Sequence, residues 1–410
     1  MILNIKFWLK ISLINLCIVA VLGVLMRYKI GFEFPYFNQK NLQHSHSHFA
    51  FSGWLAHTLM VLMVYYIQTK ITDFDGNKYK KIIIANLICS YGMLLFFIYQ
   101  GYGLISIVFS TSSIFVAYYF AYLFFKDLKL LDSDLLSKNW FKAALFFNII
   151  SSLGTFYLAY MMVSKNVIQD LYLSSIYYYL HFQYNGWFFF ACMGLLFGFL
   201  NLRKSEHPFY ETSYNLFALA CIPAYFLSIL WLDLPIWLFV ITVIAAFIQV
   251  YSWFKFLFLL IKTRRDSLEN FSPLLRYILL FVGFALSIKL LLQLGSTVPI
   301  ISQLAFGFRP IVIAYLHLIL LAIITLFILF YIYANHLIYI NKKIKYGILL
   351  FSTGVLLNEI VLGIQGLASL SYTSIPFVNE ILFGIAILLF IGIGFISYFS
   401  IKKVKNKPLL

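Results

Sequence analysis

The sequence predicts an all-α protein, a polytopic membrane helix bundle of about twelve transmembrane helices. Two observations on composition and one on pattern predict it. Hydrophobic residues make up 63% of the 410-residue chain and charged residues 11%, whereas soluble proteins carry roughly 25% charged residues. The mean hydropathy is +0.92. One apolar run follows another, and about 20 helical residues cross a hydrocarbon core of ~30 Å. Irregular backbone cannot face lipid, so these runs must be helices.

We expect the chain, residues 1–410, to form a single integral membrane domain without an inserted soluble domain. The first apolar run is too long for a signal peptide and lacks a small-residue cleavage pattern, so it is interpreted as the first span. The predicted spans are approximately 6–28, 47–69, 81–100, 103–125, 141–163, 172–202, 213–232, 235–261, 275–294, 307–334, 344–366 and 377–400.

The distribution of positive charge predicts the orientation. Lysine and arginine cluster after every even-numbered span, whereas the opposite loops hold few, apart from the first with Arg27, Lys29 and Lys40. By the positive-inside rule, both termini are cytoplasmic and even-numbered helices run from outside to inside. The clusters are Lys70, Lys78, Lys80 and Lys81; Lys126, Lys129 and Lys138; Arg203 and Lys204; Lys262, Arg264 and Arg265; Lys342, Lys343 and Lys345; and Lys402, Lys403, Lys405 and Lys407.

The formal net charge of +16 does not indicate nucleic-acid binding, because the lysines are scattered through short inter-helix segments instead of forming one basic face. The four cysteines fall inside predicted spans without CxxC spacing, which is typical of small buried hydrophobic residues. The composition therefore favours neither a nucleic-acid partner nor a disulfide framework; the surrounding partner is membrane lipid.

Three alternating histidines, His44, His46 and His48, stand where an outer loop is expected to enter the second helix. Imidazole is the commonest metal ligand in proteins. If this segment is helical, His44 and His48 share a face and His46 does not. If it is extended, all three can share one face.

Two further histidines lie at matching depth. His181 and His317 each follow about ten residues of a helix that starts outside, which places both imidazoles roughly 15 Å below the outer boundary. Ionisable side chains inside a bilayer mark functional sites by default; the alternative is an interhelical hydrogen bond. His57 is open to both interpretations, whereas His207 and His336 are expected at cytoplasmic helix ends.

At these residues the chain resembles subunit I of the haem-copper oxidase superfamily, which includes cytochrome oxidases and nitric oxide reductases. The twelve-helix plan and the run His-Ser-His-Phe-Ala-Phe-Ser-Gly-Trp, in the second helix, carry the resemblance, together with Val-Ile-Ala-Tyr-Leu-His317 in the tenth. It implies that His46 or His48 and His317 are the axial ligands of a low-spin haem. His181 stands where the sixth helix of the family supplies a copper ligand, and Tyr184 follows it.

The departures from the family pattern indicate a degenerate binuclear centre. The family needs a histidine pair on its seventh helix, but this chain has no histidine between His207 and His317. Tyr315 replaces the histidine that would bind the high-spin haem, although a phenolate can bind ferric haem. We therefore expect a low-spin haem site to survive and the oxygen-reducing site to be dismantled.

The resemblance implies a b-type haem held by two imidazoles. Arg309 at the start of the tenth helix could pair with a propionate carboxylate or extend its guanidinium to the interface. A copper ion is a further candidate cofactor, since imidazole suits copper and zinc. The residues that could bind it are His44, His46, His48 and His181. The residues that would carry catalysis are left open, with Tyr184, Tyr315 and Glu359 as candidates.

Three other charged residues in or near the predicted spans have a functional or a structural interpretation. Glu359 could relay protons near the histidines, whereas Glu380 is expected as an acid at a helix N-terminus, favoured by the helix dipole. Lys289 could extend outward to the interface.

Three functions remain open at this stage. The first is a redox protein that binds haem, with copper as a further candidate; if it is an enzyme, it is an oxidoreductase. It would work with a partner redox subunit or a quinol or cytochrome donor in a bacterial inner membrane. The second is a metal or small-solute transporter that captures its cargo at the outer histidines and should contain repeats with broken helices. The third is a haem-based or metal-based sensor, which should carry an output domain.

Overall fold

The computed structural model describes residues 2–302 and 308–402, and its regular elements there are helices, with one isolated bridge between Leu135 and Arg203. The first half holds α1 Ile5–Gly31, α2 Gln39–Phe49, η1 Ala50–Ala56, α3 His57–Gln68, α4 Asn77–Gln100, α5 Leu104–Leu128, α6 Ser137–Val163, α7 Gln169–His181, η2 Phe182–Phe188 and α8 Phe189–Phe199. The second half holds α9 Pro208–Cys221, η3 Pro223–Ile229, α10 Ile236–Glu269, α11 Pro273–Gly295, α13 Arg309–His317, η4 Leu318–Thr325, α14 Leu326–Ala334, α15 Lys342–Leu370 and α16 Val378–Ile401.

The described residues contain ten helices that are long and apolar enough to cross a membrane, or eleven if the bent pair α9 and η3 forms one span. The chain is therefore a polytopic helical membrane protein, as its composition predicts. The helical run Gln169–Phe199 is not among these ten or eleven, because its central tyrosines, His181, Gln183 and Asn185 lower its hydropathy. The expected number of twelve spans stays a prediction.

Each predicted span has a helical counterpart whose bounds differ by a few residues, with two corrections. The second helix begins at Gln39 instead of near residue 47, because the Asn38 side chain caps it by accepting from the amides of Lys40 and Asn41. The seventh span is bent by 45° between α9 and η3, where Pro223 cannot donate an intrahelical hydrogen bond. The expected tail lysines Lys403, Lys405 and Lys407 lie outside the described residues.

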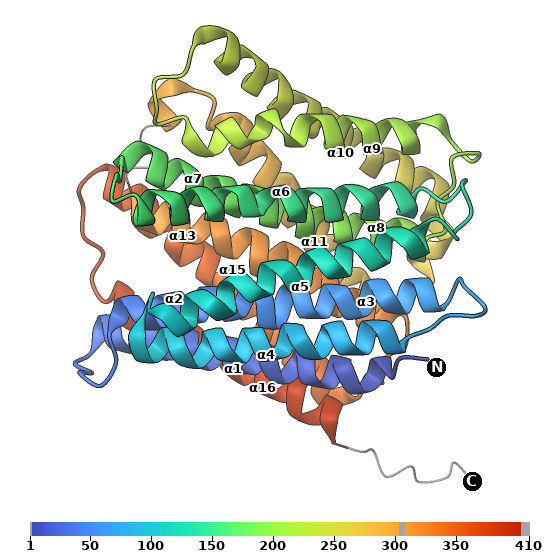
Figure 1. The fold of residues 1–410 in the computed structure, drawn as a ribbon, viewed down its shortest axis with the longest axis horizontal. Helices are drawn as coiled ribbons and strands as arrows, with labels where there is room; N and C mark the ends of the chain where they lie inside the picture. The colour runs from blue at the N-terminus through green and yellow to red at the C-terminus, as the bar shows by residue number, and fades with distance from the viewer. Residues whose placement is uncertain (1, 303–307, 403–410) are drawn as a thin grey trace.

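The helices lie roughly parallel, and the N-terminus of α1 and the C-terminus of α16 lie toward the same end of the bundle (Figure 1). We call this the lysine-rich end, since the expected Lys and Arg clusters follow helices that finish there. The run α2–η1–α3 is central, with 78% of its most apolar window buried, whereas α5 is peripheral with 17%. The histidine triplet therefore stands at the opposite end of a core helix.

Among the described residues, three helical runs contain a π-helical stretch, and each stretch lies beside a candidate histidine. The stretch η1 begins two residues after His48, η2 directly after His181 and η4 directly after His317. π-Helical hydrogen bonds, which join residue i to residue i+5, are rare and concentrate at functional sites. The wider turn changes the direction in which the later side chains of the helix point. The three runs that carry intramembrane histidines thus share one local irregularity.

Candidate functional site

His46 lies against one face of α1. The Val19 carbonyl is the backbone group next to its imidazole, and a Cβ placed on Gly23 would be 3.6 Å from His46 Cε1. Val19, Gly23 and Arg27 recur every fourth residue, so they share this face of α1. The missing side chain at Gly23 lets the imidazole pack close to the helix, with Arg27 one turn further on.

His317, the last residue of α13, interacts electrostatically with His46 and with Arg27. The Nδ1 atoms of His46 and His317 are both buried without a hydrogen-bond partner among the described residues. Two imidazoles from different helical runs, α2–η1–α3 and α13–η4–α14, are thus near one another with unused ring nitrogens. This is one of the two pairs that the resemblance implies as axial ligands, the other being His48 with His317.

Two arginines flank this pair at the end opposite the termini. Arg27 interacts electrostatically with Arg309, and Arg309 Nη2 donates to Gln43 Oε1 across 3.2 Å. The ion pairs between described residues involve neither arginine. Two neighbouring guanidinium groups without a carboxylate partner favour an anion between them, since Arg recognises carboxylate and phosphate groups bidentately.

His44 and His48 face away from His46, as the helical alternative predicts. The His48 imidazole stacks on Phe97 with ring centroids 4.3 Å apart, and its Nε2 lies 3.0 Å from the Tyr102 hydroxyl. The His44 ring packs edge-on against Tyr102 at 4.7 Å. The neighbours of this pair are therefore on α4 and the loop after it, whereas those of His46 are on α1 and α13.

His181 has both ring nitrogens engaged. The Asn185 amide lies 3.1 Å from Nδ1, and Nε2 lies 2.9 Å from the Cys221 carbonyl oxygen. Since the amide donates, Nδ1 is the acceptor and Nε2–H donates to the carbonyl. The Asn185 side chain also lies near the Tyr315 hydroxyl, and the Tyr315 and Tyr184 rings meet edge to face at 6.3 Å. We call His181, Asn185, Cys221 and Tyr315 the His181 cluster.

The expected copper ligands are not brought together. Among residues 2–302 and 308–402, no three His, Cys, Asp or Glu side chains gather into a group that could hold a metal ion. The physical reason is the helical pitch, which turns His46 away from His44 and His48, together with the internal hydrogen bonds of His181. The structure therefore gives no common site for these four candidate ligands among the described residues, and copper binding by any of them stays a prediction.

The other sequence candidates are dispersed. Glu359, on α15, accepts from the Asn358 amide at 3.1 Å; Glu380 stands in the first turn of α16, as expected. His207 caps α9 by accepting from the Phe209 amide, which confirms its place at a helix end. His57 is buried against Trp8.

Lys289 requires a correction. It does not extend outward but is buried, and it lines a small cavity with Asn185 and Gln249. This places a lysine beside the His181 cluster instead of at the interface.

Sequence reasoning missed Gly23, Arg27 and Asn185 as site residues. The four-residue spacing of Gly23 and Arg27 on the first helix was a usable signal, since it gives a small residue and a cation on one face. Asn185 follows His181 by four residues, which is the spacing of a helical side-chain pair. No pattern in the sequence signals the three π-helical stretches.

No protein-family model matches the chain, and no curated protein matches it either. The fold and composition define an integral membrane helix bundle.

Proposed function

We propose that this protein binds a b-type haem between His46 and His317 and works as a membrane electron-transfer protein. The single observation that carries the proposal is the approach of these two imidazoles from different helical runs, each with an unused buried nitrogen. Of the two triplet residues that the sequence left as candidates, His46 is favoured over His48, whose Nε2 is engaged by Tyr102.

The residues around the pair fit a haem. A haem carries two propionates, and Arg27 with Arg309 offers two cations beside His317 without a competing carboxylate partner among the described ion pairs. The Val19 carbonyl can orient the His46 ring, as hydrogen-bond partners of axial imidazoles commonly do. A bis-histidine haem supplies one-electron transfer, because both axial positions are closed to substrate.

The His181 cluster supports the electron-transfer role over oxygen reduction. The two nitrogens of its imidazole are hydrogen-bonded to Asn185 and to the Cys221 carbonyl, and Tyr315 lies near the same asparagine. Binding copper through either nitrogen would break one of these buried hydrogen bonds, which costs about 1–3 kcal/mol when one partner is left unsatisfied. In this proposal the chain's own residues bind, orient and shield the haem, and a separate donor and acceptor supply and remove the electron.

The test is the visible spectrum of the purified protein, oxidised and then reduced with dithionite, after expression with ample haem. We expect a Soret band and sharp reduced α and β bands in the wild type, and their loss in His317→Ala and His46→Ala. His48→Ala is the matched control, because it removes an imidazole from the same helix but leaves the pair intact. Wild-type protein without a Soret band would overturn the proposal. Bound copper or zinc in that sample would instead favour the metal-transport alternative.

A further inference from the structure

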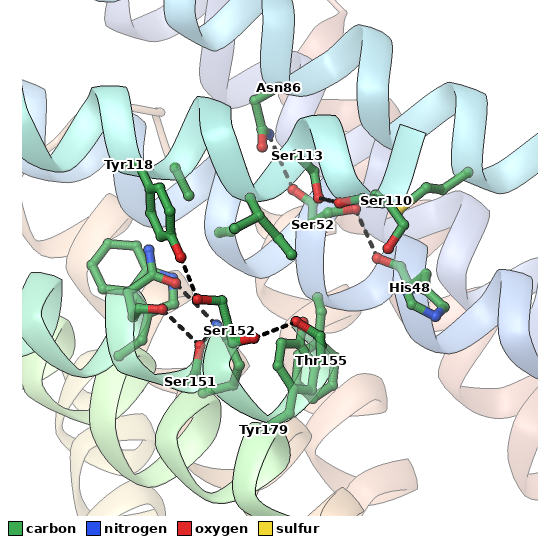
Figure 2. Close-up of a pocket in the computed structure, with 18 of the residues that line it drawn as sticks. His48, Ser52, Asn86, Ser110, Ser113, Tyr118, Ser151, Ser152, Thr155 and Tyr179 are labelled. Atoms are coloured by element: carbon green, nitrogen blue, oxygen red, sulfur yellow. Dashed lines mark hydrogen bonds between the residues drawn. The ribbon is translucent and has the colours of Figure 1, made fainter. Parts of the chain in front are cut away.

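A polar cavity of about 80 Å³ lies within the bundle, apart from His46 and His317. Its walls come from the α2–η1–α3 run, from α4, α5 and α6, and from the α7–η2 run. Figure 2 shows hydroxyl side chains of α5 and α6 pointing toward one another across this space, with His48 at one side. We call it the hydroxyl cavity.

The cavity separates two helices that turn polar faces toward each other. Its α5 wall includes Ser110, Ser113 and Tyr118, at intervals of three and five residues, and its α6 wall is Asn148, Ser151, Ser152 and Thr155. The α6 spacings of three and four residues put that set on one helical face, whereas Tyr118 reaches the cavity from a wider arc of α5. Polar faces inside a membrane domain need partners, because an unsatisfied group in hydrocarbon costs several kcal/mol.

Most of the hydroxyl hydrogens are used inside the helices. Ser113 donates to the Ser110 carbonyl, Ser152 to the Ile149 carbonyl and Thr155 to the Ser152 carbonyl, at 2.6–2.7 Å. A hydroxyl has one hydrogen and two lone pairs. These side chains therefore present oxygen lone pairs to the cavity, and a matching ligand must donate hydrogen bonds.

The wall groups around Tyr118 and Gln183 extend this pattern. Because Ser152 already donates within its helix, Tyr118 is the donor in its hydrogen bond to Ser152. Gln183 donates to Asn148 Oδ1 at 2.9 Å and to Ser151 Oγ at 2.8 Å. The described lining residues include no carboxylate to balance a cation, and an unbalanced charge in this environment is costly. A small neutral donor fits the lining.

His48 connects the cavity to the end of the bundle opposite the termini. It lines the cavity and contacts the hydroxyl of Tyr102, whose side chain is 57% exposed. His48 in the cavity wall and the exposed Tyr102 thus connect the cavity with this end of the bundle.

We propose that the hydroxyl cavity is a water site, which holds several hydrogen-bonded water molecules and fills from the end opposite the termini past Tyr102 and His48. The volume is sufficient, since one buried water needs at least roughly 10–15 Å³. The water site does not depend on haem binding. Its wall accepts hydrogen bonds, and the family resemblance implies no ligand for this cavity.

The test is the reactivity of introduced cysteines in full-length protein, reconstituted into sealed vesicles after replacing Cys17, Cys89, Cys192 and Cys221 with alanine. The probe is methanethiosulfonate ethylammonium, added from one side with a thiol scavenger trapped on the other. Ser113→Cys and Thr155→Cys face the cavity, whereas Phe115→Cys and Leu153→Cys are matched controls on the same helices that face outward, with exposed fractions of 58% and 56%. All four variants are first checked for monodisperse elution.

We expect the cavity cysteines to react at least about tenfold faster than the controls, because the reactive thiolate forms readily only where water reaches the sulfur. Reaction should occur from the side opposite the termini, and Tyr102→Ala should accelerate it. Equal, slow reaction of cavity and control cysteines would overturn the water site. Reaction only from the side of the termini, or rates unchanged by Tyr102→Ala, would overturn the proposed entrance.

Discussion

The indole N–H of Trp54 donates to Thr325 Oγ1 across 3.0 Å, and this hydrogen bond joins two π-helical stretches, η1 and η4. Trp54 follows His46 by eight residues and Thr325 follows His317 by eight residues, so the bond ties together the two helical runs that carry the proposed haem ligands. Both side chains are buried. This buried hydrogen bond fixes the relative position of the two helical runs, because leaving either group unpaired in an apolar interior is costly.

We predict that Trp54→Phe lowers the stability of the protein by about 1 kcal/mol, with a larger loss if Thr325 stays unpaired. The reason is that the variant keeps an aromatic ring but removes the donor. The measurement is thermal unfolding in detergent. Trp237→Phe is the control, since that side chain is 63% exposed on α10. Equal changes in the melting temperature of both variants would contradict the prediction.

A second prediction concerns Gly23. A Cβ at this position would lie 3.6 Å from His46 Cε1, which is ordinary contact, so Gly23→Ala should retain haem. Gly23→Leu should displace the His46 ring and abolish the reduced α band. Gly283→Leu is the control, since a Cβ there meets no atom within 4 Å. A full α band in Gly23→Leu would show that His46 is not an axial ligand.

A third prediction concerns the two arginines. Arg27→Gln and Arg309→Gln should each weaken haem binding about tenfold, since each removes a charge-assisted hydrogen bond to a propionate. The measurement is haem retention during dilution, followed at the Soret band. Arg265→Gln removes an exposed guanidinium that pairs with Glu269 on α10 and should change nothing. Unchanged retention in both test variants would remove these arginines from the site.

A fourth prediction concerns pH and the lysine-rich end. The Ser205 hydroxyl donates to Asp134 Oδ2 at 2.7 Å and lowers the pKa of that carboxyl below its usual range, aided by the Ser205 amide. Because the folded pKa is the lower one, this stabilisation is complete above the unfolded pKa of about 3.9 and disappears as the pH falls through the folded value.

We therefore expect Asp134→Asn to lower the melting temperature at pH 6 and to match the wild type at the acid end of a titration. Asp73→Asn, in the loop between α3 and α4, serves as the control. A difference between wild type and Asp134→Asn that persists unchanged into acid would contradict the assignment to this carboxylate.

Composition and apolar run lengths were sufficient to predict a helical membrane protein, because a chain in lipid has few ways to satisfy its backbone. The helix positions followed for the same reason. The start of the second helix was missed because Asn38 caps it earlier than hydropathy suggests. The copper expectation at His44, His46, His48 and His181 stays a prediction, and spacing along the chain does not reveal that both ring nitrogens of His181 have hydrogen-bond partners within the bundle.

Chain composition and the lengths of the apolar runs were enough to predict the membrane class, the approximate helices and the intramembrane histidines. Which histidines meet became clear from the packed helices, because pairing depends on how whole helices pack and on the π-helical stretches that rotate their faces. Helix packing also brought Arg27 beside Arg309, residues 282 positions apart in the chain. Similarly, two polar helix faces became the hydroxyl cavity only when α5 and α6 lay against each other. Local hydropathy is a property of single segments, whereas a site is a property of several segments brought together.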